Sequence, residues 1–307
     1  MRHNALGIVL IAVIVLAGAE QSVRQFQALR CAVENWAQAG LWSCLQTVHA
    51  EEKQQAKPLV AAALLSGPSQ DNFQWQGRIA QGNAIEIKGV NGNVRAEAAT
   101  GDQVEVVAIK KSRRSPLESV RIQVVEYDGG VTICAVYPSS DAKRPNVCAP
   151  GTEGHMNVNN NDVQVDFTVR VPAGVRFQGH TVNGEVAAQG LTADVEASTV
   201  NGSVHVSTKG HAEARTVNGE IEASMGRADW SDGLQFETVN GGITLDLPAT
   251  TSTELEAETL NGDISTDFPM TVQGRFSKRH MSGTIGSGGR HLSLKTVNGS
   301  IRINRAS

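Results

Sequence analysis

Residues 179–307 repeat one arrangement of apolar and polar positions along their whole length. Thr-Val-Asn-Gly, with Leu for Val in one copy, is followed by one residue and then by Val or Ile. The six full copies carry Asn-Gly pairs that begin at Asn183, Asn201, Asn218, Asn240, Asn261 and Asn298. His280–Ile285 (HMSGTI) stands where a further copy is expected, with Ser282 in place of Asn. A period of about 20 residues predicts stacked structural repeats.

The same positions are apolar in nearly every copy, which predicts three buried columns. They lie four and two positions before the Thr and five positions after it, and polar residues fill the positions between them. The first column is Phe177, Val195, Ala212, Leu234, Leu255, Phe276 and Leu292; the second is Gly179, Ala197, Ala214, Phe236, Ala257, Lys278 and Leu294; the third is Val186, Val204, Ile221, Ile243, Ile264, Ile285 and Ile301.

Two structures compete for this pattern. Asn-Gly between strands is a strong hairpin signal, so an antiparallel meander is one alternative. The other is a single-stranded β-helix, or β-solenoid, in which each residue lies on its equivalent in the next coil. The shared columns favour the β-solenoid, with the C-terminal coil left uncapped after Ser307.

Each Asn-Gly pair is then predicted to be a corner of one coil. Gly accepts a positive φ without steric cost, and Asn tolerates the left-handed conformation better than most residues. A column of Asn side chains can also hydrogen-bond from coil to coil. The predicted corners are Asn91 with Gly92, Asn183 with Gly184, Asn201 with Gly202, Asn218 with Gly219, Asn240 with Gly241, Asn261 with Gly262, and Asn298 with Gly299.

Residues 71–178 alternate apolar and polar residues around Gly-containing turns, which predicts a less regular β-rich part of the same domain. It contains one early copy of the motif, at Val90–Val94. The fold class is therefore all-β.

Residues 1–70 differ from the rest of the chain. Residues 5–19 carry no charge and end in Ala-Gly-Ala, which predicts a signal peptide or, if it is not cleaved, a membrane anchor. Residues 20–70 are predicted to be a helical segment and a linker, because apolar residues recur there every three or four positions between Val23 and Trp36. The chain is therefore expected to be exported, to the periplasm or the cell envelope.

If the chain is exported, its four cysteines can form disulfides, because disulfides persist outside the cytoplasm. They fall into two local pairs, Cys31 with Cys44 and Cys134 with Cys148. Four cysteines allow three connectivities, so local pairing is a hypothesis. The better candidate is Cys134 with Cys148, which bracket a loop containing proline.

Composition and charge narrow the classes of function. Aromatic residues make up only 4% of the chain, which favours a thin core of small and β-branched side chains. The net charge of −4 gives no indication of a basic surface of the kind that binds nucleic acid. A membrane contact is expected only through the N-terminal segment.

An enzyme that cleaves polysaccharides would need converging carboxylates. Asp162 and Asp166, with His155 nearby, are predicted to form a solvent-facing row. Glu196, Glu213 and Glu256 belong to an exposed column, and His205 and His211 lack partners at metal-ligand spacing. No catalytic, cofactor-binding or metal-binding residue is therefore assigned.

The strand-rich first half, the segment VPAGVRFQGHTVNGEV and the tandem Val-Asn-Gly-x-Val/Ile copies resemble the bacterial putative-adhesin domain family of unknown function. The resemblance covers roughly residues 75–305. It implies an exported β-helical protein, similar to the head domains of auto-transporter adhesins and often found with envelope-stress systems, and it implies no catalytic residues.

The predicted function is that of a non-enzymatic cell-envelope protein whose adhesin-like surface binds an envelope protein or polymer. A carbohydrate-active β-helix enzyme is the alternative, and end-to-end self-association is a third possibility.

Overall fold

The computed structural model describes residues 71–141, 143–272 and 277–306, all within one compact unit that spans Gln70–Ser307. The predicted signal and helical segments, with Cys31 and Cys44, lie outside the described residues. Those described contain one short 3-10 helix, η1 (Leu117–Ser119), and otherwise only strands. The strands are β1 (Asn72–Gly77), β2 (Ala84–Lys88), β3 (Val94–Ala98), β4 (Val104–Lys111), β5 (Arg121–Tyr127), β6 (Gly130–Val136), β7 (Gln164–Val171), β8 (Arg176–His180), β9 (Val186–Leu191), β10 (Val195–Ser198), β11 (Val204–Thr208), β12 (Ala212–Arg215), β13 (Ile221–Met225), β14 (Leu234–Glu237), β15 (Ile243–Pro248), β16 (Thr253–Asn261), β17 (Ile264–Thr266), β18 (Met270–Val272), β19 (His280–Ile285), β20 (His291–Asn298) and β21 (Ile301–Ala306).

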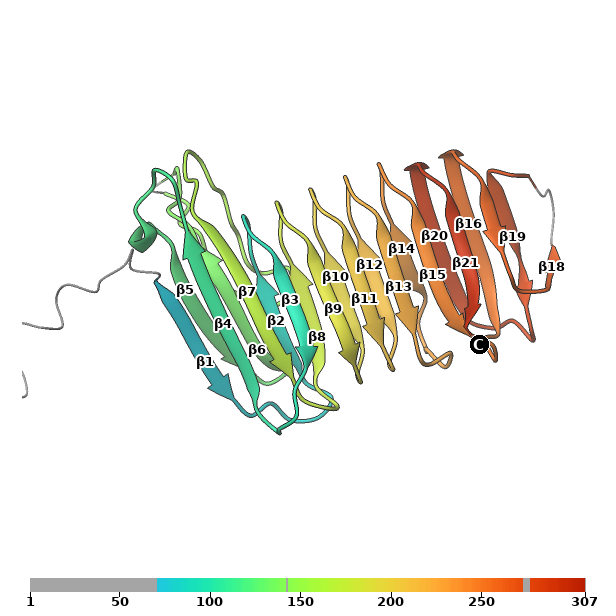
Figure 1. The fold of residues 1–307 in the computed structure, drawn as a ribbon, viewed down its shortest axis with the longest axis horizontal. Coiled ribbons are helices and arrows are strands. Elements are labelled where there is room, and N and C mark those ends of the chain that lie inside the picture. The colour runs from blue at the N-terminus through green and yellow to red at the C-terminus, as the bar shows by residue number, and fades with distance from the viewer. Residues whose placement is uncertain (1–70, 142, 273–276, 307) are drawn as a thin grey trace, which may run out of the picture. The chain divides into compact units, whose positions relative to one another are not determined.

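These strands form two mixed sheets that face each other across the core (Figure 1). Sheet A has the order β1-β4-β7-β3-β9-β11-β13-β15-β21-β17, and sheet B has the order β18-β19-β16-β20-β14-β12-β10-β8-β2-β6-β5. Pairing is parallel through the middle of both sheets and antiparallel near the ends, between β1, β4 and β7, between β5 and β6, and between β16, β19 and β18. The all-β prediction is therefore confirmed.

Seven segments each place one strand in sheet B and the next strand in sheet A, and we call each of them a coil. Neighbouring coils pair in parallel and in register, so that Val186, Val204 and Ile221 lie in one line. Parallel pairing excludes the antiparallel meander for these coils. In spatial order the coils are β2–β3, β8–β9, β10–β11, β12–β13, β14–β15, β20–β21 and β16–β17.

The spatial order of the last two coils differs from their order in the sequence. Strand β14 pairs with β20, and β15 pairs with β21, so the final coil of the chain lies inside the stack. Ile243 consequently lies between Ile221 and Ile301, and Ile264 pairs with Ile301 from the other side. The expectation of an uncapped C-terminal coil is wrong, because β21 is paired along both edges.

The expected seventh copy, His280–Ile285, does not form a coil. It is strand β19, which runs antiparallel to β16 and to the short strand β18. Lys278 explains the difference, since it occupies a position that must be buried in a coil and it is exposed here. The segment instead extends sheet B beyond the last coil, with Met281 and Ile285 on its buried face.

The predicted columns form the core between the two sheets. Apart from the copy that includes Phe276, Lys278 and Ile285, every apolar side chain of the three columns is buried, and Gly179 is buried with them. Burial of the same position in each coil confirms that the columns face inward. Aromatic side chains enter this core at few places, among them Phe167, Phe177 and Phe236.

Residues 71–171 build the N-terminal end of both sheets and also supply the coil β2–β3. Strands β4, β7 and β1 continue sheet A, while β6 and β5 continue sheet B (Figure 1). Within the part of the chain that the structure describes, no helix has the length and hydropathy of a membrane span.

Replacing Ile243 with Asp tests the inward-facing column. The side chain is fully buried between Ile221 and Ile301, so the substitution places an unpaired charge in a dry stack. We expect a loss of about 4 kcal/mol or more in the free energy of unfolding. Thr244→Asp, the next position along the same strand and facing outward, is the matched control and should cost no more than about 1 kcal/mol. Urea unfolding of both variants measures the difference, and equal losses would contradict the assignment of faces.

Candidate interaction surface

The Asn side chains at the corners form a continuous ladder along the stack. Each Asn beyond Asn91 donates a hydrogen bond from Nδ2 to Oδ1 of the Asn on the neighbouring coil, at 2.8 Å in every step. The backbones at these positions also bridge in parallel. The ladder runs through Asn91, Asn183, Asn201, Asn218, Asn240, Asn298 and Asn261.

Close packing explains the glycine at every corner, and a positive φ adds to the requirement at four of them. No corner Asn has a positive φ, whereas φ is 128° at Gly92, 156° at Gly184 and 159° at both Gly202 and Gly299. A Cβ added at Gly219 would overlap the carbonyl oxygen of Gly202, and the other repeat corners after the first are equally tight against the corner glycine of a neighbouring coil. The expected positive φ is therefore found at four of the seven corner glycines but at no corner Asn, and Gly is needed at every corner because the backbones touch.

The Thr of each motif completes the corner. Its buried hydroxyl donates to the carbonyl of the corner glycine on the neighbouring coil, as from Thr216 to Gly202 at 2.8 Å and from Thr238 to Gly219 at 3.0 Å. This satisfies a carbonyl inside the corner that would otherwise lose a partner. Sequence reasoning assigned no role to this Thr, although its presence in every full copy was the available signal.

The second residue of each motif faces solvent beside the Asn ladder. Five valines in this position are 37–39% exposed, and Leu260 on the outermost coil is 61% exposed. The corners thus present a narrow apolar row next to an amide row, with neighbouring coils about 4.8 Å apart as in any sheet. The valines are Val182, Val200, Val217, Val239 and Val297.

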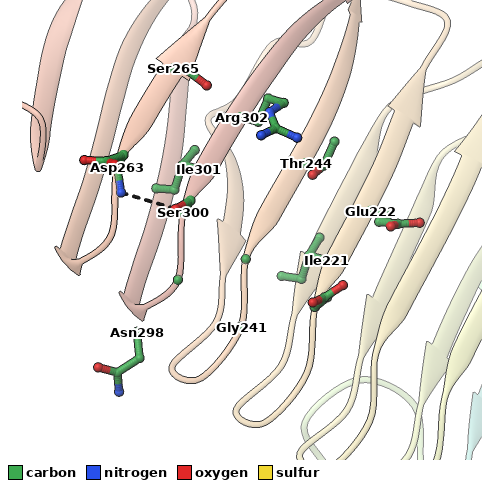
Figure 2. A pocket seen from close by; sticks show the side chains of 13 residues that line it. Ile221, Glu222, Gly241, Thr244, Asp263, Ser265, Asn298, Ser300, Ile301 and Arg302 are labelled. Carbon is green, nitrogen blue, oxygen red and sulfur yellow. Dashed lines mark hydrogen bonds between the residues drawn. The ribbon is translucent and has the colours of Figure 1, made fainter.

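A shallow depression of about 600 Å³ lies on the outer face of sheet A near the corners (Figure 2). It crosses β13, β15, β21 and β17. Gly242 creates it, since this residue has no side chain where Glu220 and Ser300 stand in register on either side. Gly242 breaks a row that is otherwise polar, and this was the sequence signal for a site that sequence reasoning missed.

Charged side chains border the depression on both sides. Glu222 is on β13, Arg302 is on β21, and Asp263 directly precedes β17 (Figure 2). Glu222 also contacts the His205 ring, with 3.1 Å between Oε2 and Nδ1. The side chains of Asp263 and Arg302 make no ion pair with another described residue. Such a border can accept hydrogen bonds from hydroxyl or amino groups and donate to an acceptor, which suits a polar ligand.

The glutamates of the exposed column on sheet B are half-buried and paired. Glu196 accepts a hydrogen bond from Gln178 at 3.0 Å, Glu213 lies 3.7 Å from Arg215, and Glu256 lies 3.8 Å from Lys295. Burial raises the pKa of Glu213, and the nearby charge of Glu196 adds to the increase. Glu196 and Glu256 thus join neighbouring coils, whereas Glu213 pairs along its own strand.

Asp162 and Asp166 hold different parts of the backbone. Asp162 precedes β7 and accepts hydrogen bonds from the backbone N–H groups of residues 113–115, which lower its pKa, with Ser115 contributing most. Asp166 is partly buried, but the backbone N–H of Asn93 and the Lys111 ammonium outweigh that burial and lower its pKa as well. His155 pairs with Val147 through its backbone. The two aspartates face outward, with Val163 and Val165 buried between them, so the expected solvent-facing row is present, although each carboxylate contacts a different segment of the chain.

A buried carboxylate fixes the loop that follows β6. Glu86 is 1% exposed and accepts hydrogen bonds from Thr132 at 2.7 Å and from the Gly151 N–H at 3.2 Å. Lys88 lies 3.2 Å from the same carboxylate and donates to the carbonyl of Ala149. The loop is also tied down by a disulfide between Cys134 and Cys148, whose Cα atoms are 5.7 Å apart.

His180 lies beside this buried carboxylate. Its Nδ1 is 2.7 Å from the Ser198 hydroxyl, and its Nε2 is 3.8 Å from Glu86, which is too long for a hydrogen bond. Burial lowers the pKa of His180 despite the carboxylates around it. Because Glu86 is already bonded to Thr132, Gly151 and Lys88, it does not orient the imidazole as the acid of a catalytic triad does.

The remaining candidate histidine, His211, joins two acidic residues. It lies 3.3 Å from Asp194 and 3.0 Å from Asp229, which also pairs with Arg227. The hydrogen bond from Arg227, followed by the one from His211, holds the pKa of Asp229 well below its usual range. Within the described residues, no group of three or more His, Cys, Asp or Glu side chains is arranged to hold a metal ion.

The stacked strands and corners define a class of all-β domain. In it, coils that pair in register build two sheets with long polar outer faces, and the same corner repeats at each coil. The chain belongs to the Toastrack family of domains, DUF4097, whose model matches residues 82–304. No curated protein sequence matches the chain.

Several solved structures are similar to it. A putative cell adhesion protein from Clostridium sporogenes is 12% identical with a TM-score of 0.41, and the match covers 76% of this chain and 100% of that one. A putative adhesin from Bacteroides fragilis is 16% identical with a TM-score of 0.34, covering 77% and 98%. A putative adhesin from Parabacteroides distasonis is 11% identical with a TM-score of 0.26, covering 76% and 98%.

Gly219→Ala tests close packing at the corner. The backbone of Gly219 does not require glycine, but the added Cβ would collide with the Gly202 carbonyl. We expect a destabilisation of about 1–3 kcal/mol from overpacking. Gly101→Ala is the control, because nothing lies within 4 Å of the added Cβ there, and it should be neutral or slightly stabilising. Thermal melts compare the two, and a harmless Gly219→Ala would show that the coils can separate without cost.

Thr216→Val tests the hydroxyl contact while keeping the shape of the side chain. The Gly202 carbonyl would lose its donor, and an unsatisfied buried acceptor costs about 1–3 kcal/mol. Thr244→Val on the outer face should change the free energy of unfolding by less than about 0.5 kcal/mol. Chemical denaturation of both variants measures the difference, and indistinguishable midpoints would remove the proposed role of the Thr.

Proposed function

We propose that this chain is a non-enzymatic protein of the cell envelope in which a β-solenoid scaffold presents an adhesin-like interaction surface. The observation that carries the proposal is the in-register stacking of the coils. It repeats the same outward positions along each face at intervals of about 4.8 Å. A partner with regularly spaced polar groups, such as an envelope polymer or an extended protein segment, meets equivalent side chains at successive coils.

The depression on sheet A supplies a place where such a partner can be anchored. Its floor is backbone and the Thr244 side chain, and its border carries Glu220, Glu222, Asp263 and Arg302. Both signs of charge are present with several hydroxyl groups, which favours recognition through hydrogen bonds. Concave sites with a few convergent polar groups are the usual form of a binding site.

Two features support export. Residues 1–19 have the charged start, apolar run and small-residue pattern of a signal peptide or anchor. The disulfide between Cys134 and Cys148 suits an oxidising compartment outside the cytoplasm. Fractionation of cells that express the full chain tests this part, and recovery from the cytoplasm alone would contradict it.

The carboxylates considered for polysaccharide cleavage make structural contacts with their neighbours. This supports the non-enzymatic part of the proposal. Asp162 and Asp166 hold loop backbone, Glu196 and Glu256 pair with neighbouring strands of sheet B, and Glu213 pairs with Arg215 on its own strand.

Filling the depression tests the binding role. We expect Thr244→Trp to lower retention of the full chain on purified envelope polysaccharide or peptidoglycan at least tenfold, because the indole occupies the space above Gly242. Gln189→Trp is the matched control, since Gln189 is exposed on β9, a strand of sheet A that does not line the depression, and the variant should keep normal retention. Co-sedimentation with the polymer measures binding, and a reducing-end assay on the same samples measures cleavage.

Equal retention of both Trp variants would overturn the depression as the anchor. Release of new reducing ends by the natural chain would overturn the non-enzymatic proposal.

A further inference from the structure

We propose that β1 pairs with β1 of a second copy of this chain, so that sheet A continues across a two-fold axis. β1 is the outermost strand of sheet A, and among the described residues it pairs only with β4. Its sequence, NFQWQG, is in unbroken register with β4 and carries no charge, no proline and no bulge. An edge of this kind is a template for another strand, and proteins that avoid such pairing place a charge, a proline or a bulge there.

The other sheet edges within the described residues are shorter or charged. Sheet A ends at its other side with the three-residue strand β17, and sheet B ends there with the equally short β18. The remaining edge strand, β5, carries Arg121 and Glu126. β1 is therefore the edge best suited to pairing, and it lies at the opposite end from the C-terminal coil expected to self-associate.

The side chains of β1 select one register for the pairing. Phe73 and Trp75 are half-buried on the core side, while Asn72, Gln74 and Gln76 are exposed on the outer face. Directly opposite residues of an antiparallel pair share a face, so core-side residues must oppose core-side residues. A two-fold axis through Gln74 satisfies this condition. It places Phe73 opposite Trp75 of the second copy, twice, and Asn72 opposite Gln76.

Both faces are chemically matched in this register. The two Phe–Trp pairs extend the apolar core across the junction, where cross-strand aromatic pairs are stabilising. The amides of Asn72, Gln74 and Gln76 meet other amides on the outer face, with no like charges opposed. A second copy of the chain is thus the occupant that the strand fits, and a two-fold interface is the commonest form of such an assembly.

Cysteine cross-linking of the full chain, solubilised in mild detergent, tests the register. In the dimer the two copies of residue 74 face each other with Cα atoms about 4.5–5.5 Å apart, within reach of a disulfide. Gln74→Cys should give a dimer band on a non-reducing gel that disappears on reduction. Gln76→Cys alone should give at least tenfold less, and a mixture of Gln76→Cys with Asn72→Cys should restore the band. The natural chain controls for its own cysteines.

Charge repulsion gives an independent readout. Gln74→Lys would oppose two ammonium groups on the axis, so analytical ultracentrifugation should show at least a tenfold weaker dimer, whereas Gln103→Lys on an exposed loop should leave it unchanged. Equal cross-linking at residues 74 and 76, or none at 74, would overturn the proposal. A chain that stays monomeric at high concentration would overturn it as well, because β1 would then be unused or covered within one chain.

Discussion

The contact between corner glycines on neighbouring coils is the constraint on which the rest of the structure depends. Each glycine lies so close to the next that a methyl group has no room, because an added Cβ would overlap a carbonyl oxygen of the neighbouring coil. The Thr hydroxyl then satisfies that carbonyl from inside, and the Asn amide joins the coils from outside. Three residues of one tetrapeptide thus fix the spacing and the register of neighbouring coils together. With the register fixed, every apolar column must coincide along the stack, and so must every outward row.

The sequence predicted which residues face inward, because the columns depend only on strand alternation and on stacking. Val204, Ile221 and Ile243 are in the same column on the same physical grounds, and they are buried as expected. The order of the coils was not predictable in this way. All copies have the same columns and corners, so the coil β20–β21 fits against β14–β15 as well as β16–β17 does. In the structure, β19 pairs along one edge of β16, which leaves the other edge for β20.

The role of the glycines shows a second limit of sequence reasoning. A repeated Asn-Gly is compatible with a left-handed turn and with a close backbone approach. The sequence alone does not show which of these applies at a given corner. The candidate site was missed for a related reason. The prediction used the positions that the copies share, and Gly242 is not one of them. It matters because it departs from the row formed by Glu185, Ser203, Glu220 and Ser300. In a stack of equivalent coils, a binding site is created where one copy differs from its neighbours.

The internal position of the last coil changes how the stack ends. In a simple repeat array the terminal coil contacts one neighbour and frays first. Here β21 lies between β15 and β17, so the outermost coil of sheet A rests on the last strand of the chain rather than on the strand before it in sequence. β16 and β17 are therefore joined to β14 and β15 through the strands of residues 291–306. The long-range pairing ties the outer coil to the centre of the stack, and the short antiparallel strands β18 and β19 then extend sheet B beyond it. The polar faces keep one spacing over all seven coils because each corner glycine contacts the corner glycine of its neighbour in space, whatever their order in the sequence.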